Sequence, residues 1–360
     1  MKFRRSLIIF AATMLVLNGA FQSLDCPGKS LSAARIDVKV VTDEADAVLA
    51  ILAKRKSKIN LSETDWQRLF QSDGYVRLKR RDSAMKRPFT DEEFKTFVNC
   101  DDLLSKERSF SRTLRAWKQA DVKSAARRAL VYLSEAAVIR AKIYPVIKPR
   151  SNSFVFELNS DPAIFLYLDP SETRKQFENT LAHEFHHIGY GTACPRPQIE
   201  SESSKLPQEV KDTLHWVGAF GEGFAMLAAA GAPTVHPHKF SSSEDRSRWD
   251  RDVANFNNDL QRVDHFFGEI LAGSLKENER DERGFSFFGV QGPWYTVGWK
   301  MAVVIETTYG RATLIECTCD PRKLLSTYNE AAQQYNKRTG ESLALWSAAV
   351  VERLNSPKPQ

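Results

Sequence analysis

Residues 169–191 read DPSETRKQFENTLAHEFHHIGYG, and this stretch carries an unusually clear helix signal. Asp169 is a typical N-cap residue, Pro170 suits the first helical position, and Glu172 completes a capping-box pattern. The glycines that follow Ile188 are typical stop signals. We therefore predict a helix that begins at about residue 169 and ends near Ile188.

This predicted helix has two faces with different chemistry. Each residue advances the helix by about 100°, so His183 and His187 lie about 40° apart on one face. A second face is apolar and can turn toward a core; it contains Phe177, Leu181, Phe185 and Ile188. Two imidazoles one turn apart can bind one zinc ion, and Glu184 can reach a metal-bound water as a general base. The H-E-x-x-H pattern therefore predicts a zinc site, with His186 beside it or at the surface rather than among the ligands.

A catalytic zinc ion needs a third protein ligand and a fourth position for water. The pattern H-E-x-x-H-x-x-G-x-x-H is incomplete here, because Tyr190 and Ala193 occupy its glycine and last histidine positions. We expect Glu222 to be the third ligand, since the glycines on either side of it would let its helix approach the metal helix closely. His215 lies on nearly the same face as Glu222 and is either close to the metal or simply buried. Three other glutamates lack that setting: Glu200, Glu202 and Glu209.

The rest of the chain predicts an α+β protein that is predominantly helical, with a small sheet before the metal helix. Strand-like runs cover residues 35–41, 154–158 and 163–168. Helical patterns cover residues 44–53, 62–71, 91–98, 111–141, 207–230, 243–271, 293–309, 322–337 and 342–354. The sequence shows neither an internal repeat nor a low-complexity linker.

The motifs of this chain resemble those of the gluzincins, the zinc metallopeptidase clan that includes thermolysin, and within it uncharacterised bacterial zinc-dependent peptidases. The resemblance covers about residues 152–309 and rests on the H-E-x-x-H motif and a Glu-Gly-x-Ala helix. It implies a thermolysin-like zincin core with a helical C-terminal part. It also implies that His183, His187 and Glu222 bind one catalytic Zn²⁺, and that Glu184 is the general base in peptide-bond hydrolysis by metal-activated water.

The resemblance further implies a Tyr or His that stabilises the oxyanion and a strand edge where substrate docks. We expect Tyr295 in the first role, because it opens a helix in the right part of the chain, and residues 163–168 in the second. Other residues that could take the first role are His236, His238, His265 and Tyr309. The chain departs from thermolysin in its length and in its cationic N-terminal region, so the resemblance does not extend to substrate preference.

The first twenty residues predict an export signal. Three basic residues, at positions 2, 4 and 5, precede an apolar run from Leu7 to Leu17, and small residues follow at Gly19 and Ala20. We expect a signal peptide over residues 1–20 and a mature chain that is periplasmic or secreted, without a transmembrane span. An uncleaved anchor, or a lipid on Cys26, is the less favoured alternative.

The charge is distributed unevenly along a chain whose net charge is +6. Residues 21–150 carry 27 basic and 17 acidic side chains, whereas residues 151–360 carry 21 and 28. We expect the basic runs at residues 54–58 and 77–81 to form solvated helix faces, with at most weak contact with anionic surfaces. No nucleic-acid module accompanies them, so the expected partner is a peptide or protein substrate. These differences predict a basic, mainly helical N-terminal region over 21–150 and a zincin-like catalytic region over 151–360, which can form one unit with 111–150.

The five cysteines allow up to two disulfides in an oxidising compartment, and the sequence does not select the pairing. They are Cys26, Cys100, Cys194, Cys317 and Cys319. The C-x-C spacing of Cys317 and Cys319 is a weak metal pattern, and we favour a structural role for it.

Two other functions remain compatible with the sequence. The first is a zinc-containing protein of zincin fold that binds peptides or cell-envelope ligands without cleaving them. The second is a protein whose basic N-terminal region binds anionic polymer or lipid, so that the H-E-x-x-H site is incidental. Glu184 argues against the first, because a binding protein has no need for a general base.

Overall fold

The computed structural model describes residues 35–158, 160–194 and 206–355. The predicted signal peptide, Cys26, Glu200 and Glu202 lie outside the described residues. The described chain is α+β and mostly helical, as predicted, and its four strands form one sheet. It divides into two units: unit 1 contains the described residues of Met1–Glu107 and Ile139–Leu168, and unit 2 contains those of Arg108–Val138 and Asp169–Gln360. No helix within the described residues is both long and apolar enough to cross a membrane.

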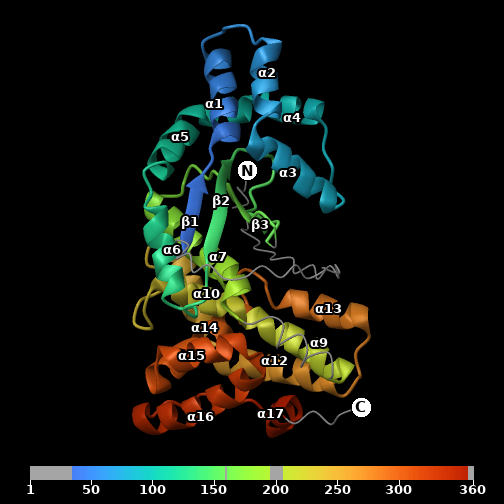
Figure 1. Cartoon of the computed structure of the whole chain (residues 1–360), viewed down its shortest axis with the longest axis vertical. Coiled ribbons are helices and arrows are strands. Elements are labelled where there is room, and N and C mark those ends of the chain that lie inside the picture. Colours follow the sequence, from blue (N-terminus) through green and yellow to red (C-terminus); the bar gives the residue numbers. More distant parts are fainter. Residues whose placement is uncertain (1–34, 159, 195–205, 356–360) are drawn as a thin grey trace, which may run out of the picture. The chain divides into compact units, whose positions relative to one another are not determined.

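Unit 1 contains the sheet (Figure 1). Its strand order is β1-β2-β4-β3. Strands β1 (Ile36–Val40), β2 (Ile139–Val146) and β4 (Ala163–Tyr167) run parallel, and β3 (Phe154–Phe156) pairs antiparallel with β4. Strand β4 therefore lies inside the sheet, with a hydrogen-bonded neighbour on each side. The expectation that residues 163–168 form a docking edge is wrong, because β3 occupies that side of β4.

The long helix predicted over residues 111–141 is also wrong in its second half. Helix α5 (Asp101–Trp117) ends early, α6 (Val122–Leu130) follows, and the chain then enters β2. The first residues of β2 alternate between buried Ile139, exposed Arg140 and buried Ala141, and a buried run follows. Alternation followed by a run that includes β-branched residues favours a strand between two neighbouring strands, whatever helical spacing the sequence also contains.

The helices of unit 1 are α1 (Asp43–Lys56), α2 (Glu63–Phe70), α3 (Asp73–Ala84), α4 (Asp91–Val98) and the first part of α5. Helix α3 was not predicted; it contains the second basic run, and there Arg77 and Arg81 are only 3% and 7% exposed, contrary to a solvated face. Arg77 Nη1 donates to Asp161 at 3.0 Å and to the Tyr144 hydroxyl at 3.1 Å.

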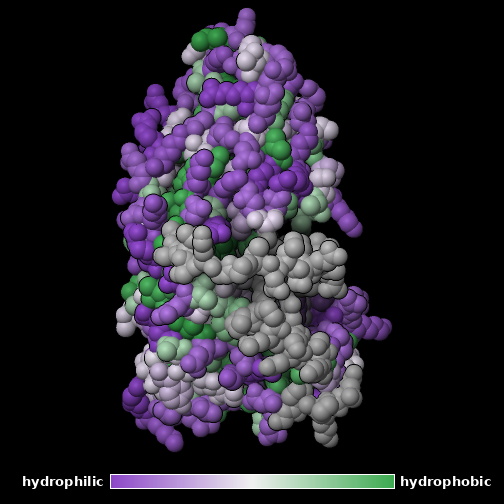
Figure 2. Space-filling model, viewed as in Figure 1, coloured by the Kyte–Doolittle hydropathy of each residue, from purple (hydrophilic) through white to green (hydrophobic). Residues whose placement is uncertain are grey.

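The first basic run is also ion-paired, with Lys54 bound to Asp65 and Lys56 to Glu107. Figure 2 nevertheless shows a mainly hydrophilic surface over α1–α4. Contact of this region with anionic surfaces stays a prediction.

Unit 2 contains the metal helix of the sequence prediction, which is α7 (Arg174–Ala193). It begins later than predicted: Thr173 is the N-cap and forms the capping box with Gln176, while the Asp169 side chain and carbonyl close a turn before it. It also continues past the two glycines. Its last turn is bound to the segment between α6 and β2, because Thr192 Oγ1 accepts a hydrogen bond from the backbone N–H of Val138 at 2.8 Å.

Unit 2 also contains the second part of α5 and α6. Its remaining elements are helical, and α13 and α15 were not predicted. They are α9 (Gln208–Val217), η1 (Gly218–Phe220), α10 (Gly221–Ala230), α11 (Ser243–Ala254), α12 (Phe256–Leu271), α13 (Glu277–Ser286), α14 (Pro293–Tyr309), α15 (Arg311–Cys319), α16 (Pro321–Thr339) and α17 (Ala348–Asn355). A disulfide joins Cys194, just after α7, to Cys319 at the end of α15. Cys100 and Cys317 are free thiols. Because Cys319 is bonded to Cys194, the C-x-C pattern has a structural role.

Candidate metal centre

The rotation of α7 about its axis is fixed by its apolar face. Phe177, Leu181 and Phe185 are fully buried and Ile188 is 5% exposed, which confirms the predicted face. The Phe177 ring also stacks on Trp117 of α5, with centroids 4.2 Å apart. With that face held in the core, the histidines of the H-E-x-x-H pattern must point to another side of the helix.

Glu222 lies on α10, whose backbone touches the backbone of α14. A Cβ built on Gly223 would lie 2.1 Å from the Trp299 nitrogen, and one built on Gly298 would lie 2.7 Å from the Phe220 carbonyl oxygen. Neither position can carry a side chain without moving a helix. Gly223 was expected to allow close approach to α7, but its Cβ position faces α14, whereas a Cβ on Gly221 would meet nothing within 4 Å. We did not predict the role of Gly298. The sequence signal for it is a glycine in the middle of a predicted helix, where glycine is unfavourable.

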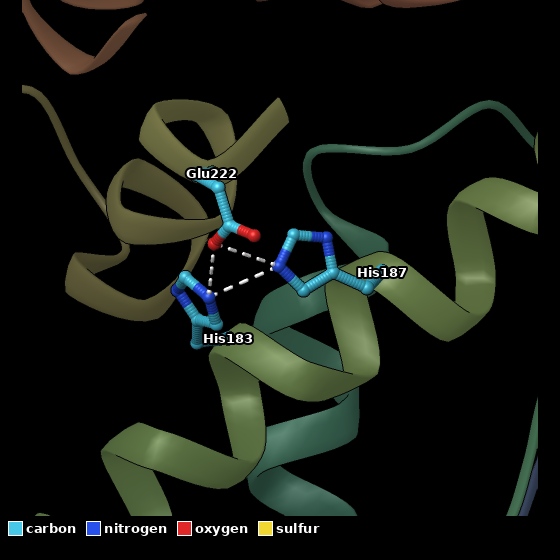
Figure 3. A group of neighbouring side chains, drawn as sticks. All are labelled: His183, His187 and Glu222. Atoms are coloured by element: carbon cyan, nitrogen blue, oxygen red, sulfur yellow. Dashed lines mark hydrogen bonds and ion pairs between the residues drawn. The ribbon is translucent and has the colours of Figure 1, made fainter. Parts of the chain in front are cut away.

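The side chains of His183, His187 and Glu222 converge on one point (Figure 3). His183 Nε2 lies 3.0 Å from His187 Nε2 and 3.0 Å from Glu222 Oε2, and His187 Nε2 lies 3.2 Å from the same carboxylate oxygen. His183 and Glu222 are 6% and 4% exposed. The structure thus brings together, from α7 and α10, the three residues predicted as ligands.

The charges of this cluster are strongly coupled. Burial disfavours the imidazolium form of His187, but the Glu222 carboxylate raises the pKa of His187 to about 9. Burial likewise opposes ionisation of Glu222, yet the two histidines hold the pKa of Glu222 far below its usual range. Glu222 is therefore a carboxylate over the whole neutral range, and an anionic oxygen beside two ring nitrogens is an arrangement that attracts a cation.

Glu184 lies next to this cluster on α7. It is 4% exposed, and its Oε1 has no hydrogen-bond partner. Burial raises the pKa of Glu184, the two histidines lower it, and Glu222 raises it further. A buried carboxylate oxygen without a hydrogen-bond partner costs free energy of folding. Such an atom indicates that a ligand or a water molecule binds in the space in front of it.

Tyr295, at the start of α14, is the predicted oxyanion donor that contacts this cluster. Its ring stacks over His183 with centroids 6.3 Å apart, and it is 2% exposed. Burial, the charges of Glu222 and Glu184, and a hydrogen bond to Glu222 all raise the pKa of Tyr295. Its hydroxyl therefore keeps its proton at neutral pH.

The alternatives to Tyr295 have contacts elsewhere in unit 2. His236 Nε2 lies 3.0 Å from Asp250, and His238 Nδ1 lies 3.0 Å from the Ser241 hydroxyl. His265 is exposed beside Glu269. Tyr309 accepts a hydrogen bond from Gln334 at 2.7 Å. None of these contacts involves the His-His-Glu cluster.

The remaining candidates do not join the cluster either. His186 is 2% exposed, and burial lowers its pKa to about 3, so it is a neutral buried residue rather than a surface one. His215 is exposed, and its ring contacts Trp216. Because η1 separates its helix from α10, His215 does not share a helix face with Glu222. Glu209 forms an ion pair with Arg353 at 2.7 Å.

The donor atoms of the cluster fit zinc. Two imidazole nitrogens and one carboxylate oxygen are ligands that zinc prefers, and a set of three leaves a coordination position open. Two ring nitrogens facing each other at 3.0 Å can share at most one proton, and when that proton leaves, both lone pairs are directed at the same point. The fold and the cluster together define a helical α+β protein with the donor set of a zinc hydrolase.

The chain belongs to the family described as "Putative zinc dependent peptidase (DUF5700)", whose model matches residues 42–337. This membership confirms the resemblance to zinc-dependent peptidases. It supports a zinc peptidase in general and implies peptides or proteins as the substrate class. Neither a curated protein nor a solved structure matches the chain.

Proposed function

We propose that this protein is an exported zinc peptidase of the gluzincin type with a thermolysin-like core, in which His183, His187 and Glu222 hold one catalytic zinc ion. The observation that supports this most directly is the convergence of three donor atoms from α7 and α10 beside a buried glutamate. When bound, zinc supplies Lewis-acid polarisation of the scissile carbonyl and activates a water molecule.

Glu184 is the general base in this proposal. Its Oε1 has no other hydrogen-bond partner, so it can accept the proton of the attacking water and pass it to the leaving amine. A pKa raised by burial makes the carboxylate a better proton acceptor than an exposed glutamate. Tyr295 keeps its proton and donates a hydrogen bond to the oxyanion that develops on the scissile carbonyl.

Export and domain organisation are part of the same proposal. The Cys194–Cys319 disulfide supports an oxidising compartment, since disulfides persist in secreted and periplasmic proteins. We assign residues 1–20 to the signal peptide, 21–150 to a basic N-terminal region and 151–360 to the catalytic region. Every proposed ligand and catalytic residue falls in the last of these.

Metal analysis combined with a broad peptide-library digest tests the proposal. The purified protein should hold about one zinc ion and cleave peptides, whereas Glu184→Gln should keep the metal and lose cleavage. Undiminished turnover in Glu184→Gln would contradict the proposed base. A wild-type protein that holds zinc and binds peptides but cleaves none would be the non-catalytic binding protein instead.

A further inference from the structure

A row of aromatic rings in unit 2 leads from the metal cluster toward the surface. The Tyr295 ring, which stacks on His183, has the Phe288 ring 6.4 Å away in an edge-on contact. Phe285 stacks on Phe288 at 6.3 Å. Exposure rises along the row, from 2% at Tyr295 to 57% at Phe285, with Phe288 half-buried between them. The row therefore links an exposed apolar ring, through successive ring contacts, to the proposed catalytic residues.

The outer ring of the row is held in place by a tight helix contact. A Cβ on Gly284 would lie 2.3 Å from the Trp216 ring, so α13 lies directly against that side chain. The Gly284 carbonyl accepts a hydrogen bond from Trp294 Nε1 at 2.8 Å. Phe285, the next residue, packs against Trp216 with centroids 5.4 Å apart. Such support reduces the conformational freedom that the exposed ring would lose on binding a ligand.

The inner ring of the row is presented by a constrained turn between α13 and α14. The carbonyl of Phe288 accepts a hydrogen bond from Gly292 N–H at 2.7 Å. Gly289 and Gln291 both have positive φ, of 46° and 61°. Gln291 is not a glycine, so this conformation costs energy that the surrounding structure must supply, and such strain concentrates at ligand-binding segments.

From these contacts we infer that Phe285 and Phe288 form an apolar subsite for one substrate side chain beside the scissile bond. The subsite gives the peptidase a preference for an aromatic or large aliphatic residue at that position. An extended peptide advances about 3.3–3.6 Å per residue, so a residue next to the bond held at Tyr295 reaches a ring 6.4 Å away. Aromatic rings recognise apolar side chains through burial and edge-to-face contact. This inference rests on the proposed peptidase function.

Cleavage of matched peptides tests the subsite. We would compare two peptides that differ only in Phe or Ala at the flanking position, and take the ratio of their kcat/KM values. The wild type should favour Phe, and Phe288→Ala should lower the ratio about tenfold. Phe288→Leu should keep most of the preference, and Phe285→Ala should lower it less than Phe288→Ala. Leu345→Ala is a control at an exposed apolar residue of the same unit, 38% exposed, and should leave the ratio unchanged. A ratio that is unaltered in Phe288→Ala would overturn the inference.

Binding to the inactive variant separates this inference from the proposed function. In zinc-loaded Glu184→Gln, fluorescence anisotropy of the two labelled peptides should show tighter binding of the Phe peptide, and addition of Phe288→Ala should abolish the difference. This result would support the subsite even if the wild type cleaves neither peptide, which would contradict only the peptidase activity. Equal binding of both peptides would overturn the subsite. If Phe285→Ala instead dissociates a dimer in sedimentation and leaves peptide preference intact, the face is an interface between copies and the subsite is wrong.

Discussion

Two buried glutamates, one in each unit, are alike in burial and in the direction of their pKa shifts but differ in the atoms around them. Glu44 on α1 is fully buried and Glu184 on α7 is 4% exposed. Each has an Oε1 without a hydrogen-bond partner, and burial raises the pKa of both, that of Glu44 to about 8. A raised pKa in a buried carboxyl is the feature by which catalytic acids and bases are often recognised.

The atoms around the two carboxyls differ. Glu44 Oε2 accepts a hydrogen bond from the backbone N–H of Ile147 at 3.0 Å and ties α1 to the segment after β2. Glu184 lies beside two histidines and a second carboxylate whose donor atoms meet. Burial and a raised pKa therefore do not distinguish a structural glutamate from a proposed base. Convergent metal donors do.

The largest effect should come from replacing the two glutamates in turn. Glu184→Gln should lower kcat by about 10³-fold, because it removes the proton acceptor while leaving the shape of the side chain. Glu44→Gln should leave kcat unchanged. Initial-rate measurements on the same peptide, with zinc content determined for each variant, check this. A loss of activity in Glu44→Gln at full zinc content would contradict a purely structural role for Glu44.

The next effect concerns the donors themselves. Glu222→Ala should weaken zinc binding by at least about 100-fold, because the anionic oxygen that faces both imidazoles is lost. Competition with a chromophoric chelator measures the affinity. Glu209→Ala is a matched control, since that glutamate lies on neighbouring α9 and pairs with Arg353. Equal zinc affinity in both variants would show that Glu222 is not a ligand.

A smaller effect should appear at the two glycines that flank Glu222. Gly223→Ala should destabilise the fold by about 2 kcal/mol, because its methyl group would overlap the backbone of α14. Gly221→Ala should be neutral or slightly stabilising, since open space surrounds its Cβ position. Urea unfolding of the two variants checks this. Equal midpoints would mean that α10 and α14 are less closely packed than described.

The smallest effect, counted per pH unit, is a pH dependence of stability from Glu44. Its pKa is raised from 4.5 to about 8 on folding, so the neutral form favours the folded state. Its contribution is complete below pH 4.5 and is lost as pH rises toward 8, at a slope of about 1 kcal/mol per pH unit. Unfolding free energies of wild type and Glu44→Gln should therefore diverge from pH 5 to pH 7. This window avoids Lys148, whose pKa burial lowers to about 7 and whose titration acts in the opposite direction above it.

The parts of the site that the sequence predicted depend on local spacing. The four-residue separation of His183 and His187 places both on one side of α7 whatever the rest of the chain does. Glu222 could be selected from its neighbours through its flanking glycines, although Gly223 contacts a different helix from the one expected. The predicted N-cap was wrong, because Asp169 closes a turn and Thr173 begins the helix with Gln176 as its capping-box partner.

The parts that the sequence did not predict depend on contacts distant in the chain. Glu44 meets its partner 103 residues away, and helical spacing gives no indication of that burial. Strand β2 gains its partners from residues 36–40 and 163–167. Its short alternating start could not be separated from a continuing helix until those neighbours were known. Phe288 is positioned by the turn between α13 and α14. Nothing in the sequence indicates that Gln291 in this turn has a positive φ.

The disulfide between Cys194 and Cys319 also determines how the proposed catalytic machinery would respond to a broken backbone. The loop that it closes spans 125 residues and includes Glu222 and Tyr295, while His183 and His187 lie just before it. A single peptide-bond cut anywhere between the two cysteines would leave both fragments joined by the sulfur bridge. A peptidase exported as proposed would encounter other proteases and its own activity, and such a nicked chain would separate into two pieces only when a reductant is present.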